Sequence, residues 1–208
     1  MGIGRGAVKL ILDEGAERKF SGAVLQLGRQ DLHFSESQLE KWAQSKAYVL
    51  SEVPKEQETA ARGPLRVDLD DVEFFSMLGF DSVASADFSD YENPSMTLDL
   101  NEPIPSELHE RFDVIFDGGT MEHCFNTLQV LRNIFSMLKK GGRIIHSSPS
   151  NNHVDHGFYM YSPTLFADYY SANNWKFLSL KVFSYTSRQN TEPCLVYDYE
   201  PGSLDAFS

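Results

Sequence analysis

The stretch FDVIFDGGTMEHCFNTLQVLRNIFSMLKKGGRIIHSSP, residues 112–149, predicts a strand, a polar turn, a helix and a second strand. Residues 113–116 form a near-continuous apolar run, which is typical of a strand buried on both faces. Apolar residues at helical spacing predict a helix over 127–140, with two lysines in its last turn and Gly141-Gly142 ending it. Residues 143–146 resume as a strand. These elements predict a right-handed βαβ unit of a parallel sheet.

The loops after these two strands are where we expect a ligand. Ligands of parallel α/β sheets bind beyond the carboxyl ends of the strands, which places residues 117–126 and 147–156 at the functional edge. Gly118 and Gly119 permit a sharp turn and let a ligand approach the backbone. The stretch therefore predicts half of a nucleotide-binding α/β domain.

Four motifs along the chain point to a known family. Met121-Glu122-His123 follows the first strand, Lys139-Lys140-Gly141-Gly142 follows the helix, and Asn-His-Val-Asp-His-Gly-Phe-Tyr at 152–159 is followed by Ser162-Pro163. Here the sequence resembles class I S-adenosylmethionine-dependent methyltransferases, and among them a small subgroup that carries Asn-His-x-x-His-Gly-Phe-Tyr followed by Ser-Pro. The resemblance covers about residues 22–175.

The resemblance implies a fold, a cofactor and a reaction. The fold is a Rossmann-like α/β domain with a mostly parallel sheet of about seven strands, the last one antiparallel. We expect one domain over residues 1–208, with a mobile insertion around the polar residues 51–66. The implied cofactor is S-adenosylmethionine, and the implied reaction is methyl transfer to a small molecule such as a sugar or another cell-surface precursor.

The remaining elements follow from local patterns of apolar and turn-forming residues. We expect a leading helix or a partly ordered arm at about 1–20, helices at about 37–50, 70–78 and 163–173, and strands at 22–28, 82–87, 96–100, 177–185 and 195–199.

Composition limits the partners and the compartment. The chain has 208 residues, 41% of them hydrophobic, and a net charge of −12, which argues against binding to nucleic acid or to anionic membranes. Cys124 and Cys194 show no metal or disulfide spacing and fit a reducing cytoplasm. The apolar stretch near the N-terminus is too short for a signal peptide and no apolar run approaches transmembrane length, so we expect neither a signal peptide nor a transmembrane span. It is compatible with a monomer or a homodimer.

The cofactor residues follow from the strand ends. Gly28 follows the first strand, where an adenosyl-binding loop needs glycine, although it is also typical of a simple turn, and Gln30 replaces the second glycine. Asp87 can accept hydrogen bonds from two ribose hydroxyls, or it can cap a turn. For Asp99 the resemblance implies an adenine contact, with a turn acid as the alternative. The loop after the next strand completes the cofactor set with Asp117, Gly118, Gly119 and Thr120.

Histidines are the candidate bases. A neutral imidazole at His123 could accept a proton from the acceptor, or it could pack at a helix start. His153, Asp155 and His156 form the densest ionisable cluster, and we weigh a catalytic wall, a metal site and structural hydrogen bonding for it. We predict no metal site, because Asn151 stands where a His-x-His-x-Asp-His pattern needs another histidine.

Aromatic residues next to this cluster could shape the acceptor pocket. Phe158 and Tyr159 precede a predicted helix and are the pocket candidates, whereas Phe166, Tyr169 and Tyr170 lie at helical spacing and should pack. The alternative function is a noncatalytic binding or scaffolding module that has lost the glycine loop. The ionisable groups gathered at one sheet edge favour the enzyme.

Overall fold

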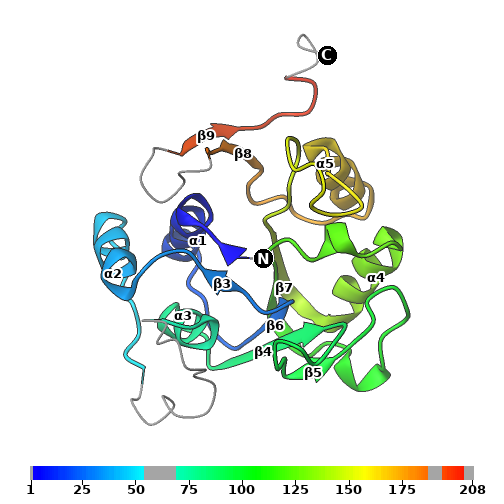
Figure 1. Ribbon diagram of the computed structural model, residues 1–208, viewed down its shortest axis with the longest axis horizontal. Coiled ribbons are helices and arrows are strands. Elements are labelled where there is room, and N and C mark those ends of the chain that lie inside the picture. Colours follow the sequence, from blue (N-terminus) through cyan, green and yellow to red (C-terminus); the bar gives the residue numbers. More distant parts are fainter. Residues whose placement is uncertain (1, 54–68, 187–193, 204–208) are drawn as a thin grey trace.

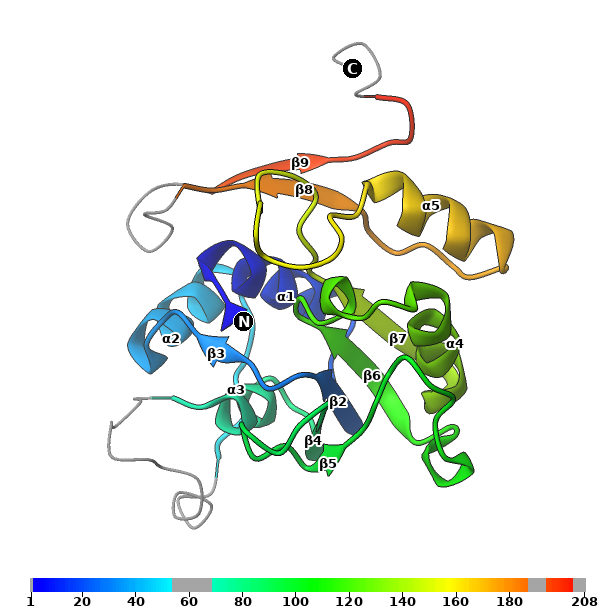
Figure 2. The same ribbon diagram turned by 45° about the vertical axis from the view of Figure 1, so that its right-hand side comes forward.

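The computed structural model describes residues 2–53, 69–186 and 194–203 of the chain. The predicted insertion at 51–66 lies for the greater part outside these residues. Figures 1 and 2 show a central sheet with helices on both faces and a two-stranded ribbon above it. The α/β, Rossmann-like fold class is thereby confirmed.

The central sheet consists of five parallel strands in the order β5-β4-β2-β6-β7. The strands are β2 (Ala23–Leu27), β4 (Ser82–Asp87), β5 (Met96–Thr97), β6 (Phe112–Asp117) and β7 (Leu138–His146). The chain leaves β2 in one direction to form β4 and β5, and then returns to β2's other side to form β6 and β7. This reversal opens a crevice at the carboxyl ends of β2 and β6, which is where open α/β sheets bind ligands.

Each face of the sheet has its own core because side chains alternate along a strand. Val24 and Phe116 face a cluster with helices α1 (Arg5–Glu17), α2 (Glu36–Ser45) and α3 (Asp71–Met77). Leu25 and Ile115 face the opposite cluster, built with α4 (Thr127–Met137) and α5 (Pro163–Ala172). All of these side chains are buried. Burial on both faces explains the apolar run at residues 114–116 of β6.

The end of α4 differs from the prediction. The helix ends at Met137, and β7 begins at Leu138, so Lys139 to Gly142 belong to the strand and not to the last helical turn. The register of β7 against β6 shifts between Phe112 and Val114, and the extra residues form a bulge there. Lys139 Nζ lies 2.7 Å from Asp113 Oδ2, and Gly141 takes a φ of 79°. Pairing with β6 thus ends the helix earlier than the glycine pair Gly141-Gly142 predicts.

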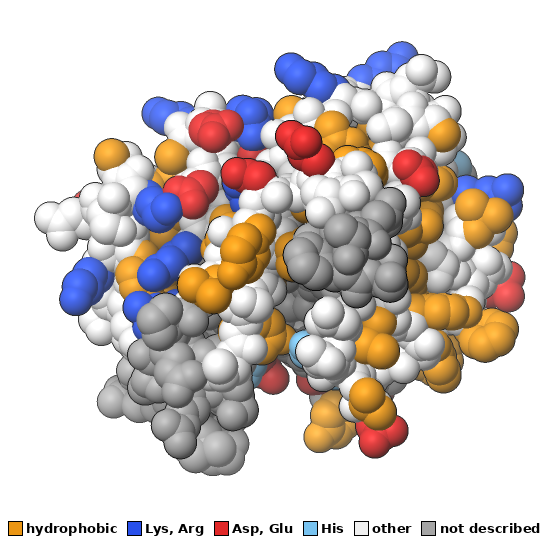
Figure 3. Space-filling model, turned by 90° about the horizontal axis from the view of Figure 1, so that it is seen from above, with side chains coloured by type: hydrophobic (Ala, Val, Ile, Leu, Met, Phe, Trp, Pro, Cys, Tyr) orange, Lys and Arg blue, Asp and Glu red, His pale blue; other side chains and the backbone are white. Residues whose placement is uncertain are grey.

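The last two strands also differ from the prediction of a single seven-stranded sheet. Strands β8 (Lys181–Ser184) and β9 (Leu195–Asp198) pair antiparallel with each other and, within the described part of the chain, form a sheet of their own. This ribbon packs on α1, where a Cβ on Gly6 would lie 2.7 Å from Cys194 Sγ. Figure 3 shows the face above the ribbon, with acidic, basic and hydrophobic side chains interspersed.

Four short elements complete the described part of the chain. Strand β1 (Gly2–Ile3) pairs in parallel with β3 (Asp31–Leu32), and the 3-10 helices η2 (Ser106–Leu108) and η3 (Met121–His123) precede and follow β6. Among the described helices, none has the length and hydrophobicity to cross a membrane.

Candidate functional site

The carboxyl ends of β2, β4 and β6 and the chain after β5 surround a cavity of about 510 Å³. Seven of the residues predicted from the sequence line it, and they come from five separate segments of the chain: Gly28, Asp87, Asp99, Gly119, Thr120, His123 and Phe158. The lining also includes Glu92 and Cys124, for which the sequence suggested no role. The structure therefore brings most of the predicted cofactor residues to one place.

Gly28 has a steric reason to be glycine. Its φ is 70°, its N–H donates to the carbonyl of Ala86 at 2.7 Å, and a Cβ would lie 2.7 Å from Thr120 Oγ1. Only glycine tolerates this left-handed conformation without strain. The turn after β2 consequently brings bare backbone to the cavity wall.

Gln30 occupies the position of the missing second glycine and fills the space beneath this turn. It is 5% exposed, and its Nε2 donates to the carbonyls of Leu27 and Gly28 at 3.3 and 3.2 Å. A Cβ on Gly118 would lie 2.2 Å from Gln30 Oε1. Gly118 thus packs against Gln30 and is outside the cavity lining, unlike Gly119.

Asp87 and Asp99 combine the two roles that the sequence left open. One oxygen of Asp87 accepts the N–H of Ser89 at 3.3 Å, and Asp99 Oδ1 accepts from both the N–H and the side-chain amide of Asn101 at 2.9 Å. These are turn contacts of the expected kind. Both residues also line the cavity, so turn formation and ligand contact are compatible at each of them.

Asp117 lies beneath the cavity and outside its lining. Its side chain is fully buried and accepts hydrogen bonds from His146 Nδ1 at 2.7 Å and from the N–H groups of Thr120 and Met121 at 2.9 and 3.2 Å. His146 Nε2 in turn lies 2.6 Å from the hydroxyl of Tyr170. Burial acts to raise the pKa of Asp117, but these hydrogen bonds outweigh it and lower the pKa. The Asp117 carboxylate thus fixes the backbone of the loop after β6 through its hydrogen bonds to Thr120 and Met121.

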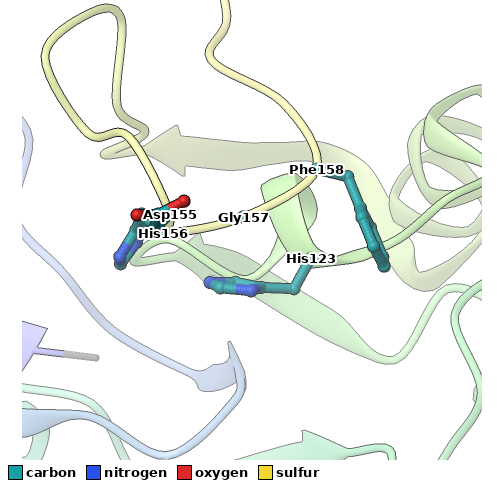
Figure 4. A pocket seen from close by; sticks show the side chains of 5 residues that line it. All are labelled: His123, Asp155, His156, Gly157 and Phe158. Atoms are coloured by element: carbon teal, nitrogen blue, oxygen red, sulfur yellow. The ribbon is translucent and has the colours of Figure 1, made fainter.

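A second cavity of about 330 Å³ adjoins the first. It is lined by His123, Asp155, His156, Gly157 and Phe158. Figure 4 shows His123 pointing from η3 toward the loop that carries His156, while Phe158 turns to the other side. His123 and Phe158 line both cavities, so a ligand in one space would face a ligand in the other across these two side chains.

The histidines gather around this second cavity. The ring centroids of His123 and His156 lie 5.0 Å apart, and those of His153 and His156 lie 5.2 Å apart. A turn in which the N–H of His156 donates to the carbonyl of His153 at 3.2 Å holds the latter pair, with Asp155 at a φ of 65°. Burial lowers the pKa of His123 and of His156. Both imidazoles are therefore neutral near pH 7, the form that can accept a proton.

Glu122 is the residue that the sequence interpretation missed. It was part of the quoted Met-Glu-His motif, but no role was given to it. Its side chain is 0% exposed, and neither carboxylate oxygen has a hydrogen-bond partner in the described structure. His156 Nε2 lies 3.5 Å from Glu122 Oε1, and burial raises the pKa of Glu122 to about 7. A carboxyl group in the segment that follows a buried strand, next to a histidine in the sequence, was the available signal.

The two aromatic pocket candidates separate in the structure. Phe158 is 66% exposed at the wall between the cavities. Tyr159 donates its hydroxyl to the carbonyl of Phe125 at 2.9 Å and stacks on Tyr161, outside both cavity linings. Phe158 is thus the better placed of the two to meet an acceptor.

Residues 85–181 match the model of a family described as a methyltransferase domain. The matched region, just under half of the chain, begins within β4 and ends at the start of β8, so it contains the edge residues from Asp87 to Phe158. No curated protein and no solved structure matches this chain at a significant level. The family match and the five-stranded parallel sheet together support a class I S-adenosylmethionine-dependent methyltransferase-like family, whose members generally use S-adenosylmethionine.

Proposed function

We propose that this protein is an S-adenosylmethionine-dependent methyltransferase that acts on a small molecule, with a sugar or another cell-surface precursor as the acceptor class. The observation that carries the proposal is the pair of adjoining cavities. One has glycine backbone and two carboxylates at the strand ends, and the other has neutral histidines. Two such spaces with a common wall suit a donor and an acceptor held side by side.

In the larger cavity the chain offers the groups that an adenosyl cofactor needs. The backbone of Gly28 and Gly119 allows close approach of the ligand. Asp87, at the end of β4, can accept hydrogen bonds from two ribose hydroxyls, and Asp99 can accept one from the adenine amino group. Asp117 supports this wall indirectly, because it orders the loop that carries Gly119 and Thr120.

Bound S-adenosylmethionine would supply the methyl group to a nucleophilic atom of the acceptor in an in-line displacement, in which the electron pair of the broken carbon–sulfur bond would remain on sulfur and S-adenosylhomocysteine would be released. The proton released by the acceptor passes to neutral His123 or His156, while His153 supports the turn that carries His156. Alignment of donor and acceptor supplies most of the rate increase, and proton removal adds to it.

The bulk properties support the remaining parts of this proposal. A net charge of −12 disfavours nucleic acid and anionic membrane surfaces as partners and favours a small acceptor. Cys124 and Cys194 are both free thiols, which fits the reducing cytoplasm. We further propose that residues 1–208 act as one domain, as a monomer or a homodimer.

A second candidate function is a noncatalytic methyltransferase-like binding module. The observation in its favour is Gln30, whose buried side chain fills the space between the turn at Gly28 and Gly118. If this side chain also blocks the cofactor's methionine portion, the cavity would bind another ligand or none.

Calorimetric titration with S-adenosylmethionine and S-adenosylhomocysteine separates these candidates. The enzyme requires saturable binding of both compounds with one site per chain. A folded protein that binds neither would exclude the enzyme and favour the noncatalytic module. The variant Gln30→Gly is a useful companion, because binding that appears only in this variant would identify Gln30 as the block.

A further inference from the structure

The Glu122 carboxylate lies in a position that is unusual for a buried charge. Its side chain is fully buried, and both oxygens lack a hydrogen-bond partner in the described structure. A carboxylate removed from water without hydrogen bonds is strongly unfavourable, so buried carboxylates in proteins are paired, protonated or bound to a metal ion. Glu122 therefore needs a proton or a cation that the described hydrogen bonds do not supply.

Two imidazoles lie around this carboxylate. One ligand atom each from Glu122, His123 and His156 can be chosen so that all three lie within 4.8 Å of one another. Within this set, His156 Nε2 lies 3.5 Å from Glu122 Oε1. Ligand bonds of about 2.1 Å in tetrahedral geometry place neighbouring ligand atoms about 3.4 Å apart. Small side-chain movements would bring the set to this geometry.

We propose that Glu122, His123 and His156 bind one divalent first-row transition-metal ion. Two imidazoles and one carboxylate are the donor set that zinc and non-haem iron take at sites with open positions. Magnesium and calcium prefer oxygen donors throughout and are disfavoured here. This set differs from the His153, Asp155 and His156 combination, for which we weighed a metal site from the sequence and predicted none.

The backbone ties the two ligand-bearing segments together. The carbonyl of Glu122 accepts the N–H of Phe158 at 2.8 Å and that of Tyr159 at 3.3 Å. A Cβ on Gly157 would lie 3.0 Å from the same carbonyl oxygen, so a glycine there lets the loop pass directly over Glu122. The site is consequently preorganised by hydrogen bonds that do not involve the ligand side chains.

The position of the ion would give it a role in the proposed reaction. His123 and His156 line the smaller cavity, and His123 also lines the larger one. In an inference that rests on the proposed function, the open positions of the ion would hold an oxygen of the acceptor beside the methyl donor. The acceptor would then be a hydroxyl compound, ionised more easily on the metal than in water.

The test is metal titration of the full chain, freed of any affinity tag and treated with a chelator. Zinc binding is followed by calorimetry and cobalt binding by visible absorption, both without S-adenosylmethionine. We expect one ion per chain, with affinity at least 10-fold weaker in Glu122→Gln and in His156→Ala. The matched control is His153→Ala, since its ring lies beside His156 but outside the ligand set. This control should bind the ion as tightly as the unaltered chain.

Each outcome bears on the proposal. No saturable binding to the folded chain, or equal affinity in all three variants, would overturn it. A loss as large in His153→Ala as in His156→Ala would also overturn the ligand set. If Glu122→Gln does not fold, the comparison of metal affinity between His156→Ala and His153→Ala still tests the proposal. Both of these side chains are partly exposed, so we expect both variants to fold. S-adenosylhomocysteine binding is measured on the same samples, so failure of the cofactor site and failure of the metal site appear separately.

Discussion

Two buried carboxylates, Asp117 at the end of strand β6 and Glu122 five residues later, have opposite surroundings. Asp117 accepts hydrogen bonds from His146, Thr120 and Met121, and its pKa is lowered. Glu122 has no hydrogen bond to either oxygen in the described structure, and its pKa is raised to about 7. Both are fully buried next to a histidine. The two carboxylates therefore do not differ in burial. They differ in the number of hydrogen-bond donors around them.

The difference separates a structural acid from a functional one. A buried carboxylate whose hydrogen bonds are complete stabilises the fold around it, as Asp117 does for the loop after β6. One that is left incomplete destabilises the fold and is retained where a ligand or a proton completes it. Glu122 meets this description beside the smaller cavity. Four predictions test the distinction.

Matched amide substitutions should give the largest contrast. Asp117→Asn removes the charge from a complete hydrogen-bond set and places an amide against His146, so we expect a loss of about 3 kcal/mol in the free energy of unfolding. Glu122→Gln removes a charge that lacks donors, and we expect a change of less than about 1 kcal/mol, or a gain. Urea unfolding of metal-free protein at pH 7.5 measures both. Equal losses of unfolding free energy in the two variants would contradict the distinction between a structural and a functional carboxylate.

The two carboxyl groups should also give stability opposite dependences on pH. The folded-state pKa of Glu122 is about 7 against an ordinary value of 4.5, so the folded state holds the proton more tightly. Its contribution is complete below pH 4.5 and is lost as the pH rises to about 7, up to about 3 kcal/mol. The lowered pKa of Asp117 gives the opposite dependence. Its contribution to stability is present above pH 3.8, the ordinary pKa of the group, and is lost as the pH falls below that value.

Unfolding of the metal-free chain and of Glu122→Gln between pH 4.5 and 7.5 measures this dependence. The free-energy difference between them should grow in favour of the glutamine variant as the pH rises. A difference that is constant across this range would mean that Glu122 is ionised in the folded state throughout.

Asp87 offers an intermediate case, because it forms a turn contact with Ser89 and also lines the larger cavity. Asp87→Ala should weaken S-adenosylhomocysteine binding by about 10-fold to 100-fold, the effect of losing hydrogen bonds to a charged group. Its unfolding free energy should change little. His156→Ala is the matched comparison, since it should keep cofactor affinity and reduce turnover. The reverse pattern in calorimetry and activity assays would mean that the two cavities have exchanged roles.

The smallest expected effect on stability is that of Tyr170, the outermost residue of the hydrogen-bonded series Asp117, His146 and Tyr170. Tyr170→Phe removes only the hydroxyl that contacts His146 Nε2 at 2.6 Å and keeps the packed ring. We expect a loss of about 1 kcal/mol in the free energy of unfolding, the usual net value of one hydrogen bond. A loss as large as that of Asp117→Asn, measured by the same urea unfolding, would mean that the three groups act as one unit.

Much of the fold could be predicted because its signals are local. The apolar run before Asp117 and the helical spacing after Asn126 predicted β6 and α4. The end of α4 could not be predicted, because the pairing of Leu138 with Phe112 and the bulge of Lys139 to Gly142 depend on a neighbouring strand. The separate β8–β9 ribbon is a similar case, since a strand pattern does not name its partner.

The candidate site divides in the same way. The position of Gly28, Asp87 and Asp99 at one cavity could be predicted because each lies at or just after the end of a strand, and the carboxyl ends of parallel strands meet at one edge. His146 shows the limit of this argument, since it lies near His153 in the chain but joins Asp117 and Tyr170 in the core. The direction of a strand side chain depends on register, which residue order alone does not reveal.

From its residue order the chain specifies a parallel α/β sheet, the strand ends that carry glycine and carboxylates, and a histidine-rich loop after β7. Folding in three dimensions decides which carboxylate receives hydrogen bonds and which histidine stands beside the one that does not. The reason is physical: hydrophobic periodicity acts over a few neighbouring residues, whereas desolvation and hydrogen bonding of Glu122 depend on a loop more than thirty positions away, at His156 to Tyr159.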